Sequence, residues 1–262
     1  MPSVRIDDFE MYFDDYGDPS NPTLVVLHGA GAHANDPIGG WADLIPAFAA
    51  THRVVAVEHR GHGRTANPAG YMTFEQIADD VEELVAQLGL RSYDLAGISD
   101  GGVAALAIAL RGPDALRSVI VVGTNHCVDD SILAQLAIVD ADAIEQAAPE
   151  AALALADRHD GGKHPGFWRE LLRQIRENNL HNPDWSPTDL STIACPVLLI
   201  AGELDPFANI DQMTVMRRSI PRSEWLIVNH AGHAVHHEHP DLVGPRIIDF
   251  LDRVRSDGDS ST

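Results

Sequence analysis

The stretch YDLAGISDGGVAALAIAL, residues 93–110, determines how the rest of the chain is interpreted. Its apolar residues predict a buried strand over 93–98 and a helix over 99–111, joined by a very tight turn. Gly97 and Gly101 bracket Ser99 as G-x-S-x-G, and larger residues at these two positions would collide with neighbouring backbone. The pattern is typical of a nucleophile elbow, which presents a serine hydroxyl at a helix N-terminus. The alternative is that Ser99 only caps its helix.

A serine nucleophile needs a base, and the base needs an orienting carboxylate. In sheets with such an elbow the chain order is serine, acid, histidine. PVLLIAGELDPF (196–207) places Asp205 just after a late strand, and LIVNHAGHAVHHEHP (226–240) places His233 just after the next. Both lie at strand carboxyl ends, as Ser99 does. We therefore predict a Ser99, Asp205 and His233 triad.

An oxyanion formed at Ser99 needs two N–H donors. We predict the backbone N–H of Asp100 as one donor. The other is the N–H of Ala30, in the glycine-rich turn HGAGAHA (28–34). The Asp100 carboxylate has two interpretations: it anchors an ammonium group of the substrate, or it only stabilises the first turn of its helix.

Strand and helix patterns alternate along most of the chain, which predicts a doubly wound, mostly parallel α/β sheet. The alternation stops over 124–190, where alanine- and leucine-rich segments with helical spacing replace it. We predict an α/β core formed by 1–123 and 191–262, with 124–190 as a helical cap or lid inserted into it. Phe167 and Trp168 in this cap are predicted to line the substrate pocket.

The amino-acid composition limits the classes of partner that the protein is expected to bind. The chain has 262 residues with 39 acidic and 18 basic side chains, a formal net charge of −21. Such a surface repels nucleic acid and anionic lipid. The N-terminus does not resemble a signal peptide, and no apolar run approaches the roughly 20 residues of a membrane span. We expect a soluble cytoplasmic protein, a monomer or small homo-oligomer, that acts on a small molecule.

Cofactors and metals are not expected. GAGAHA lacks the third glycine of a dinucleotide-binding turn, and no acidic residue follows it at the distance of a ribose ligand. The histidines over 230–239 contain no H-E-x-x-H pattern and have no companion ligands at a recognisable spacing. We predict neither a nicotinamide cofactor nor a metal.

Five motifs are distributed over nearly the whole chain: HGAG (28–31), EHRGHGRT (58–65), GISDGG (97–102), GELDPF (202–207) and AGHAVHHEHP (231–240). Together they resemble the α/β-hydrolase superfamily. Within that superfamily, the Ser-Asp-Gly-Gly elbow resembles the valacyclovir hydrolase-like (biphenyl hydrolase-like) serine esterases. The resemblance implies the Ser99, Asp205, His233 triad and α-amino-acid esters as a substrate class. Glu58 and Thr65 depart from the aspartate and serine common in the family, at positions that look structural.

The resulting hypothesis is a serine hydrolase that cleaves a carboxylic ester through an acyl-enzyme, with α-amino-acid esters as the first subclass to test. Two kinds of alternative use the same residues. One is a different reaction on the triad: lactone opening, C–C bond hydrolysis or cofactor-free perhydrolysis. The other is a ligand-binding or sensor protein of this fold that does not turn over.

Overall fold

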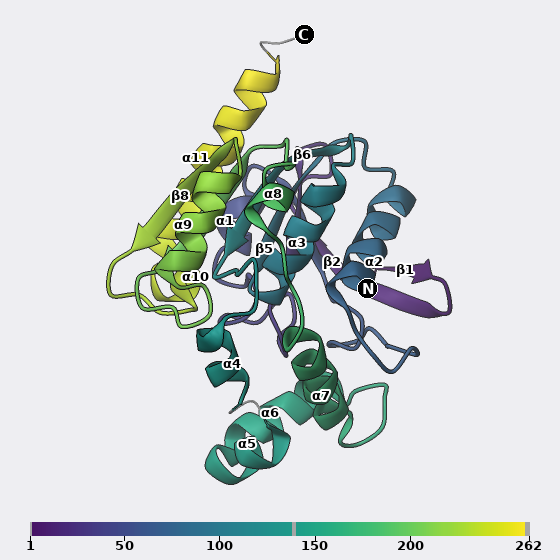
Figure 1. Cartoon of the computed structure of the whole chain (residues 1–262). Helices are drawn as coiled ribbons and strands as arrows, with labels where there is room; N and C mark the ends of the chain where they lie inside the picture. The colour runs from purple at the N-terminus through teal and green to yellow at the C-terminus, as the bar shows by residue number, and fades with distance from the viewer. Residues whose placement is uncertain (1, 138–139, 260–262) are drawn as a thin grey trace.

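The computed structural model describes residues 2–137 and 140–259. Its centre is a sheet with the strand order β1-β2-β4-β3-β5-β6-β7-β8 (Figure 1). The antiparallel pairs are β1 with β2 and β2 with β4, and the other neighbours are parallel. The strands are β1 Ser3–Ile6, β2 Phe9–Tyr16, β3 Thr23–Leu27, β4 Arg53–Val57, β5 Tyr93–Ile98, β6 Leu116–Val122, β7 Val197–Gly202 and β8 Ser223–Val228.

The central strands are buried on both faces. In β3, Val25 and Leu27 pack with one group of helices, and Leu24 and Val26 pack with the group on the opposite face. Two-sided burial requires apolar residues at every position, because successive side chains point to opposite faces. The lack of polar alternation in the sequence therefore predicted this layer correctly.

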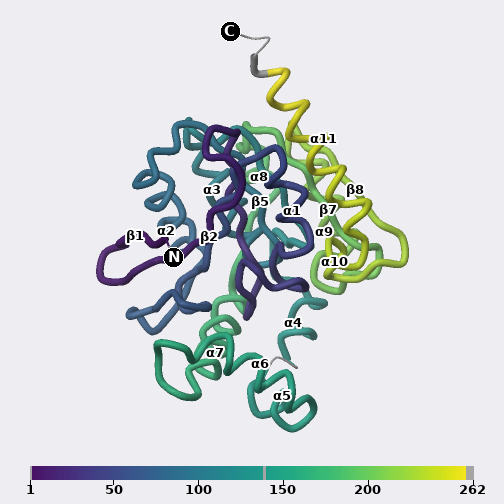
Figure 2. Tube along the Cα trace, turned by 180° about the vertical axis from the view of Figure 1, so that it is seen from behind, coloured from purple at the N-terminus to yellow at the C-terminus, as the bar shows by residue number. Residues whose placement is uncertain are grey.

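Helices cover the two faces of the sheet. One core contains side chains of α2, α3 and α9, and the other contains side chains of α1, α10 and α11 (Figures 1 and 2). The helices of these layers are α1 Ile45–Ala49, α2 Phe74–Gln87, α3 Asp100–Arg111, α9 Ile210–Ser219, α10 Val235–Glu238 and α11 Pro240–Asp259. The predicted α/β class, a doubly wound and mostly parallel sheet, is confirmed.

Among the residues that the structure describes, five helices lie between β6 and β7 in the sequence. Of these, α4 to α7 gather at one end of the sheet, opposite the end where the C-terminal helix projects (Figures 1 and 2). Among the described residues, no helix combines the length and apolar character required to cross a membrane. The five helices are α4 Asp130–Leu136, α5 Ala141–Ala147, α6 Pro149–His159, α7 Phe167–Asn179 and α8 Pro187–Leu190.

Two helical stretches are interrupted. α10 and α11 are separate helices, because His239 adopts non-helical dihedral angles ahead of Pro240. The alanine- and leucine-rich segment after β6 is divided among α4, α5 and α6. The ten-residue helix α9 was not predicted from the sequence; it contributes Met213 and Met216 to the core, and the half-buried Val215 packs against that core.

Candidate active site

Ser99 lies at the junction of β5 and α3 with φ 51° and ψ −120°, a backbone conformation that residues other than glycine rarely adopt. The two bracketing glycines explain how the turn closes. A Cβ on Gly97 would lie 2.2 Å from the Gly101 carbonyl oxygen, and one on Gly101 would lie 2.5 Å from that of His28. A Cβ on Gly102 would lie 1.9 Å from Thr124 Oγ1. The turn therefore accepts only glycine at these three positions.

The three predicted triad residues meet at this turn. His233 Nε2 lies 3.1 Å from Ser99 Oγ, and His233 Nδ1 lies 2.9 Å from both carboxylate oxygens of Asp205. Since the carboxylate only accepts, Nδ1 carries the proton and Nε2 is free to accept the serine proton. The imidazole therefore has the tautomer and position of a general base.

The environment of Asp205 favours its charged form. Burial alone would raise the pKa of this carboxyl, but hydrogen bonding and attraction to His233 outweigh burial. The backbone N–H groups of Ala208 and Phe207 add hydrogen bonds of 3.0 and 2.8 Å to one oxygen. The pKa consequently lies below its usual value, so the carboxylate can orient the imidazole and stabilise the imidazolium.

A ring contact of His28 fixes the peptide group between Gly29 and Ala30 in the turn after β3. His28 Nδ1 lies 2.8 Å from the Gly29 carbonyl oxygen, while His28 Nε2 accepts the N–H of His59 at 3.1 Å. Nδ1 therefore donates, and it holds that carbonyl on the His28 side. In a trans peptide the N–H points opposite to the C=O. The N–H of Ala30 consequently points away from the His28 ring, and Ala30 lines the pocket that contains Ser99.

Ser99 opens into a pocket of about 380 Å³. Most of its wall is apolar, and several polar side chains complete it. Its apolar side chains come from the loop after β3, from β5, from α4 and α7, and from the loops before α9 and α10: Ala30, Ile38, Ile98, Ile132, Leu136, Leu172, Ile175, Phe207 and Ala234. Its polar side chains are Ser99, Asp100, Asn125, Asn179, Asn182 and His233.

The prediction that Phe167 and Trp168 line this pocket is wrong. Neither belongs to the described residues of its wall, and both are buried elsewhere in the helical region. The Phe167 ring lies under Lys163 Nζ, and the Trp168 ring lies under the Arg169 guanidinium. Both aromatics occupy the first turn of α7, whereas the pocket meets the later turns of this helix.

The pocket contacts of α7 are Leu172, Ile175 and Asn179. None of these three residues was predicted from the sequence to line the pocket. Their spacing of three and then four residues is the signature of one helix face and was available in the sequence. It could not indicate which face of an amphipathic helix turns toward the serine.

Asp100 combines burial with a single side-chain partner. Asn179 Nδ2 donates to its two oxygens at 3.0 and 3.3 Å. Burial raises the pKa of Asp100 to about 6, although the Asn179 hydrogen bond and His233 oppose this shift. The Oδ1 atom of Asn179 is buried and accepts no hydrogen bond within the described part of the chain. Asp100 therefore places a carboxylate acceptor in the pocket wall.

The two departures from the family motif have structural roles. Glu58 is buried and accepts from the backbone N–H of Arg64 at 2.7 Å, and its Oε1 pairs with the Arg64 guanidinium at 2.8 Å. Thr65 Oγ1 accepts the N–H of Tyr12 in β2 at 3.0 Å. These contacts connect the loop after β4 to the neighbouring strand, away from Ser99.

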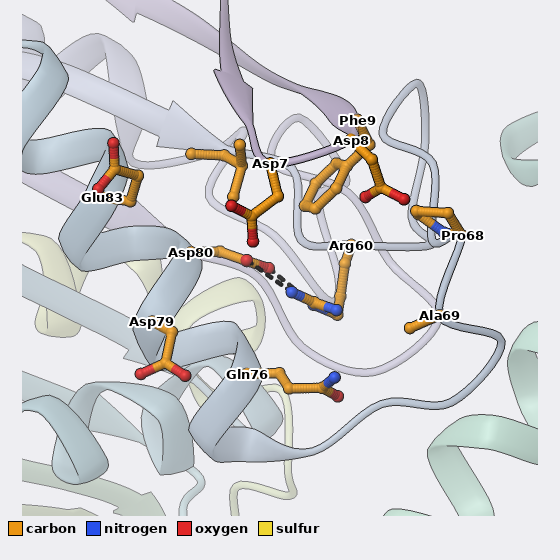
Figure 3. A pocket seen from close by; sticks show the side chains of 11 residues that line it. Asp7, Asp8, Phe9, Arg60, Pro68, Ala69, Gln76, Asp79, Asp80 and Glu83 are labelled. Carbon is orange, nitrogen blue, oxygen red and sulfur yellow. Dashed lines mark hydrogen bonds and ion pairs between the residues drawn. The ribbon is translucent and has the colours of Figure 1, made fainter.

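A second hollow lies beside β2 and α2 and shares no described wall residue with the serine pocket (Figure 3). Five carboxylates border it, and at its base Arg60 pairs with the buried Asp80 through two hydrogen bonds of 2.6 and 2.7 Å. In the described ranges, no group of three or more histidine, cysteine, aspartate or glutamate side chains is arranged to hold a metal ion.

Comparison with known proteins agrees with this geometry. The profile of the alpha/beta hydrolase family matches residues 24–245, and the chain belongs to that family. It is a hydrolase of the α/β-hydrolase fold. A putative carbamate hydrolase, RutD, from Agrobacterium fabrum is 28% identical, with 92% of this chain and 98% of that protein aligned.

A second similar protein and a similar crystal structure are named for other hydrolase activities. The sn-1-specific diacylglycerol lipase ABHD11 of Mus musculus is 27% identical, with 92% of this chain and 82% of that protein aligned. The crystal structure of an enol-lactonase from Burkholderia xenovorans LB400 has the same fold, with a TM-score of 0.77 and 21% identity. The alignment covers 96% of this chain and all of that one.

Proposed function

We propose that the protein is a serine hydrolase that cleaves carboxylic esters of small to medium size through an acyl-enzyme. The observation that carries the proposal is the unbroken chain of contacts from Ser99 through His233 to Asp205. Ser99 Oγ attacks the ester carbonyl carbon while His233 Nε2 takes its proton. Collapse of the tetrahedral intermediate expels the alcohol, which receives that proton from His233.

Water completes the reaction. His233 removes a proton from a water molecule, which attacks the acyl carbon, and Ser99 leaves with the proton returned to its oxygen. Throughout, the N–H groups of Ala30 and Asp100 stabilise the oxyanion. The N–H of Asp100 belongs to the first turn of α3, where backbone N–H groups have no partner within the helix. The mechanism requires no cofactor.

The pocket supports α-amino-acid esters as the preferred subclass. The Asp100 carboxylate lies in the wall of the pocket that contains the nucleophile, and an ammonium group would donate to it. The apolar wall would receive the amino-acid side chain or the alcohol group. Because the pKa of Asp100 is about 6, the preference for an ammonium substrate should decline as the pH falls below that value.

The test compares kcat/KM for an α-amino-acid benzyl ester with that for its desamino analogue. We expect Ser99→Ala to lose at least about a thousandfold on both substrates. Asp100→Asn should lower kcat/KM for the amino ester by about 10- to 100-fold, the usual effect of removing a charge-assisted hydrogen bond. The desamino ester is the matched control, and its hydrolysis by Asp100→Asn should stay near the wild-type rate.

Two results would redirect the proposal. If wild type and Ser99→Ala do not differ on either ester, simple ester hydrolysis is wrong. A lactone, a carbamate and a C–C diketone then become the substrates to test, and binding without turnover would indicate a sensor. If wild type prefers neither ester, Asp100 has only a structural role at the start of its helix.

A further inference from the structure

The peptide groups that follow Ala30 are held by two buried histidines. The N–H of Gly31 donates to His62 Nε2 at 3.2 Å. The carbonyl of Gly31 lies 2.9 Å from His159 Nε2 and accepts from Arg158 at 3.0 Å. His62 comes from the loop after β4, whereas Arg158 and His159 end α6, about 130 residues along the chain from Gly31. One glycine thus connects the turn after β3 to the helical region between β6 and β7.

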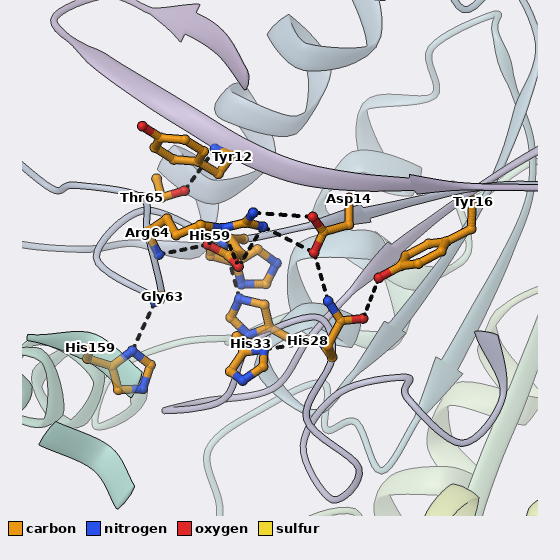
Figure 4. Close-up of polar contacts among 12 residues, drawn as sticks. Tyr12, Asp14, Tyr16, His28, His33, His59, Gly63, Arg64, Thr65 and His159 are labelled. Carbon is orange, nitrogen blue, oxygen red and sulfur yellow. Dashed lines mark hydrogen bonds and ion pairs between the residues drawn. The ribbon is translucent and has the colours of Figure 1, made fainter. Parts of the chain in front are cut away.

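The partners of each ring determine its proton position. His62 Nδ1 lies 3.1 Å from the Arg60 carbonyl oxygen, so it carries the proton and leaves Nε2 to accept from Gly31. His159 Nδ1 accepts the N–H of Gly63 at 3.0 Å, so its Nε2 carries the proton and donates to Gly31 (Figure 4). Each role requires a neutral imidazole with one particular tautomer.

The surroundings favour these neutral forms. Burial is the main cause that lowers the pKa of His62 well below its usual range and that of His159 to about 4. Nearby positive charge acts in the same direction on both rings. The charged and titratable groups that act on one or both of these rings are His28, His33, His59, Arg158 and Lys163.

We propose that His159 and His62 are positioning residues for the oxyanion hole, so that docking of α6 fixes the direction of the Ala30 N–H. This inference rests on the proposed function of Ser99. Gly31 has a φ of +62° and no side chain of its own to restrict it. His62 fixes the peptide between Ala30 and Gly31, and His159 fixes the next one. Together with the bond from His28 to Gly29, three successive peptides are held.

The consequence for catalysis follows from geometry. An oxyanion donor is effective only when it lies at hydrogen-bond distance from the charge that develops, and displacement by about 1 Å can cost about a hundredfold in rate. The hydrogen bond strengthens in the transition state, so its loss should reduce kcat and leave substrate binding largely unchanged.

The test uses three substitutions in the full-length protein. His159→Leu removes both bonds of the ring. His159→Gln retains an N–H donor of similar reach for the Gly31 carbonyl. His164→Gln is the matched control, because His164 is exposed in the same segment and has no contact with Gly31. The readouts are kcat and KM for p-nitrophenyl butyrate, normalised to folded enzyme, and the rate of Ser99 labelling by diisopropyl fluorophosphate.

We expect His159→Leu to lower kcat and the labelling rate by about 10- to 100-fold, with KM within about threefold of wild type. His159→Gln should recover most of the loss, and His164→Gln should match wild type. Wild-type kcat in His159→Leu, an effect confined to KM, or no recovery in His159→Gln would each overturn the inference while the proposed function stands. If wild type neither hydrolyses the ester nor labels at Ser99, the proposed function fails and the inference fails with it.

Discussion

The most direct test of the buried histidines is the stability of a His59→Leu variant as a function of pH. His59 is 1% exposed, and its ring stacks on that of His28 with 4.1 Å between centroids. Its Nε2 makes no hydrogen bond within the part of the chain that the structure describes. Leucine is apolar and of comparable size, and the backbone bond from residue 59 to His28 remains available.

The expected magnitude comes from the proton that His59 binds on unfolding. Burial lowers its pKa from 6.5 to about 3, so between these values the unfolded chain is protonated at this position and the folded chain is not. The neutral His59 ring therefore costs the folded state no free energy of protonation above pH 6.5. The free energy of unfolding decreases as the pH falls from 6.5 toward 3, because only the unfolded chain binds the proton. At pH 5 the loss is about 2 kcal/mol, against a few tenths at pH 7.

The assay is reversible urea unfolding at pH 7 and pH 5, followed by circular dichroism. Between these values the wild type should lose about 2 kcal/mol more of its free energy of unfolding than His59→Leu does. Replacement of the exposed His181 by leucine is the control and should retain the wild-type pH dependence. If His59→Leu and wild type lose the same free energy on acidification, His59 is not a neutral buried imidazole and the reasoning is refuted.

Two further predictions concern the sheet edge and the triad. Gly202→Ala should destabilise the protein by about 3 kcal/mol or more, because its Cβ would lie 2.2 and 2.3 Å from two backbone oxygens. Gly161→Ala, whose Cβ would meet no atom within 4 Å, should unfold at nearly the wild-type temperature, and equal melting of both variants would contradict the packing argument. Asp205→Asn should fold normally but lower kcat by about 10³- to 10⁴-fold, because an amide no longer holds the His233 tautomer. An ester-hydrolysis assay that finds wild-type kcat would remove Asp205 from the mechanism.

Features that depend on local backbone geometry were predictable from the sequence. The glycines at 97, 101 and 102 stand where a Cβ would meet atoms within 3 Å, so the pattern and the turn require each other. Asp205 and His233 were predictable because parallel strands end at one edge of a sheet, which brings residues far apart in sequence to one place.

Features that depend on how helices are docked were not predictable. α7 is amphipathic, but the sequence does not say which of its turns meets the serine pocket, and the bulky first turn proved to be buried elsewhere. The same holds for the contact between Asn179 and Asp100, 79 positions apart, and for that between His159 and Gly31. Each is a tertiary contact whose residues carry no local pattern.

The central claim is that Ser99 forms a covalent acyl-enzyme. Intact-protein mass spectrometry of the enzyme quenched in acid during steady-state hydrolysis of p-nitrophenyl butyrate tests it most directly, followed by peptide mapping. The account predicts one butyryl adduct, located on the peptide that contains Ser99 and absent from Ser99→Ala. Turnover by Ser99→Ala at the wild-type rate, or an adduct on another residue that accounts for turnover, would contradict it.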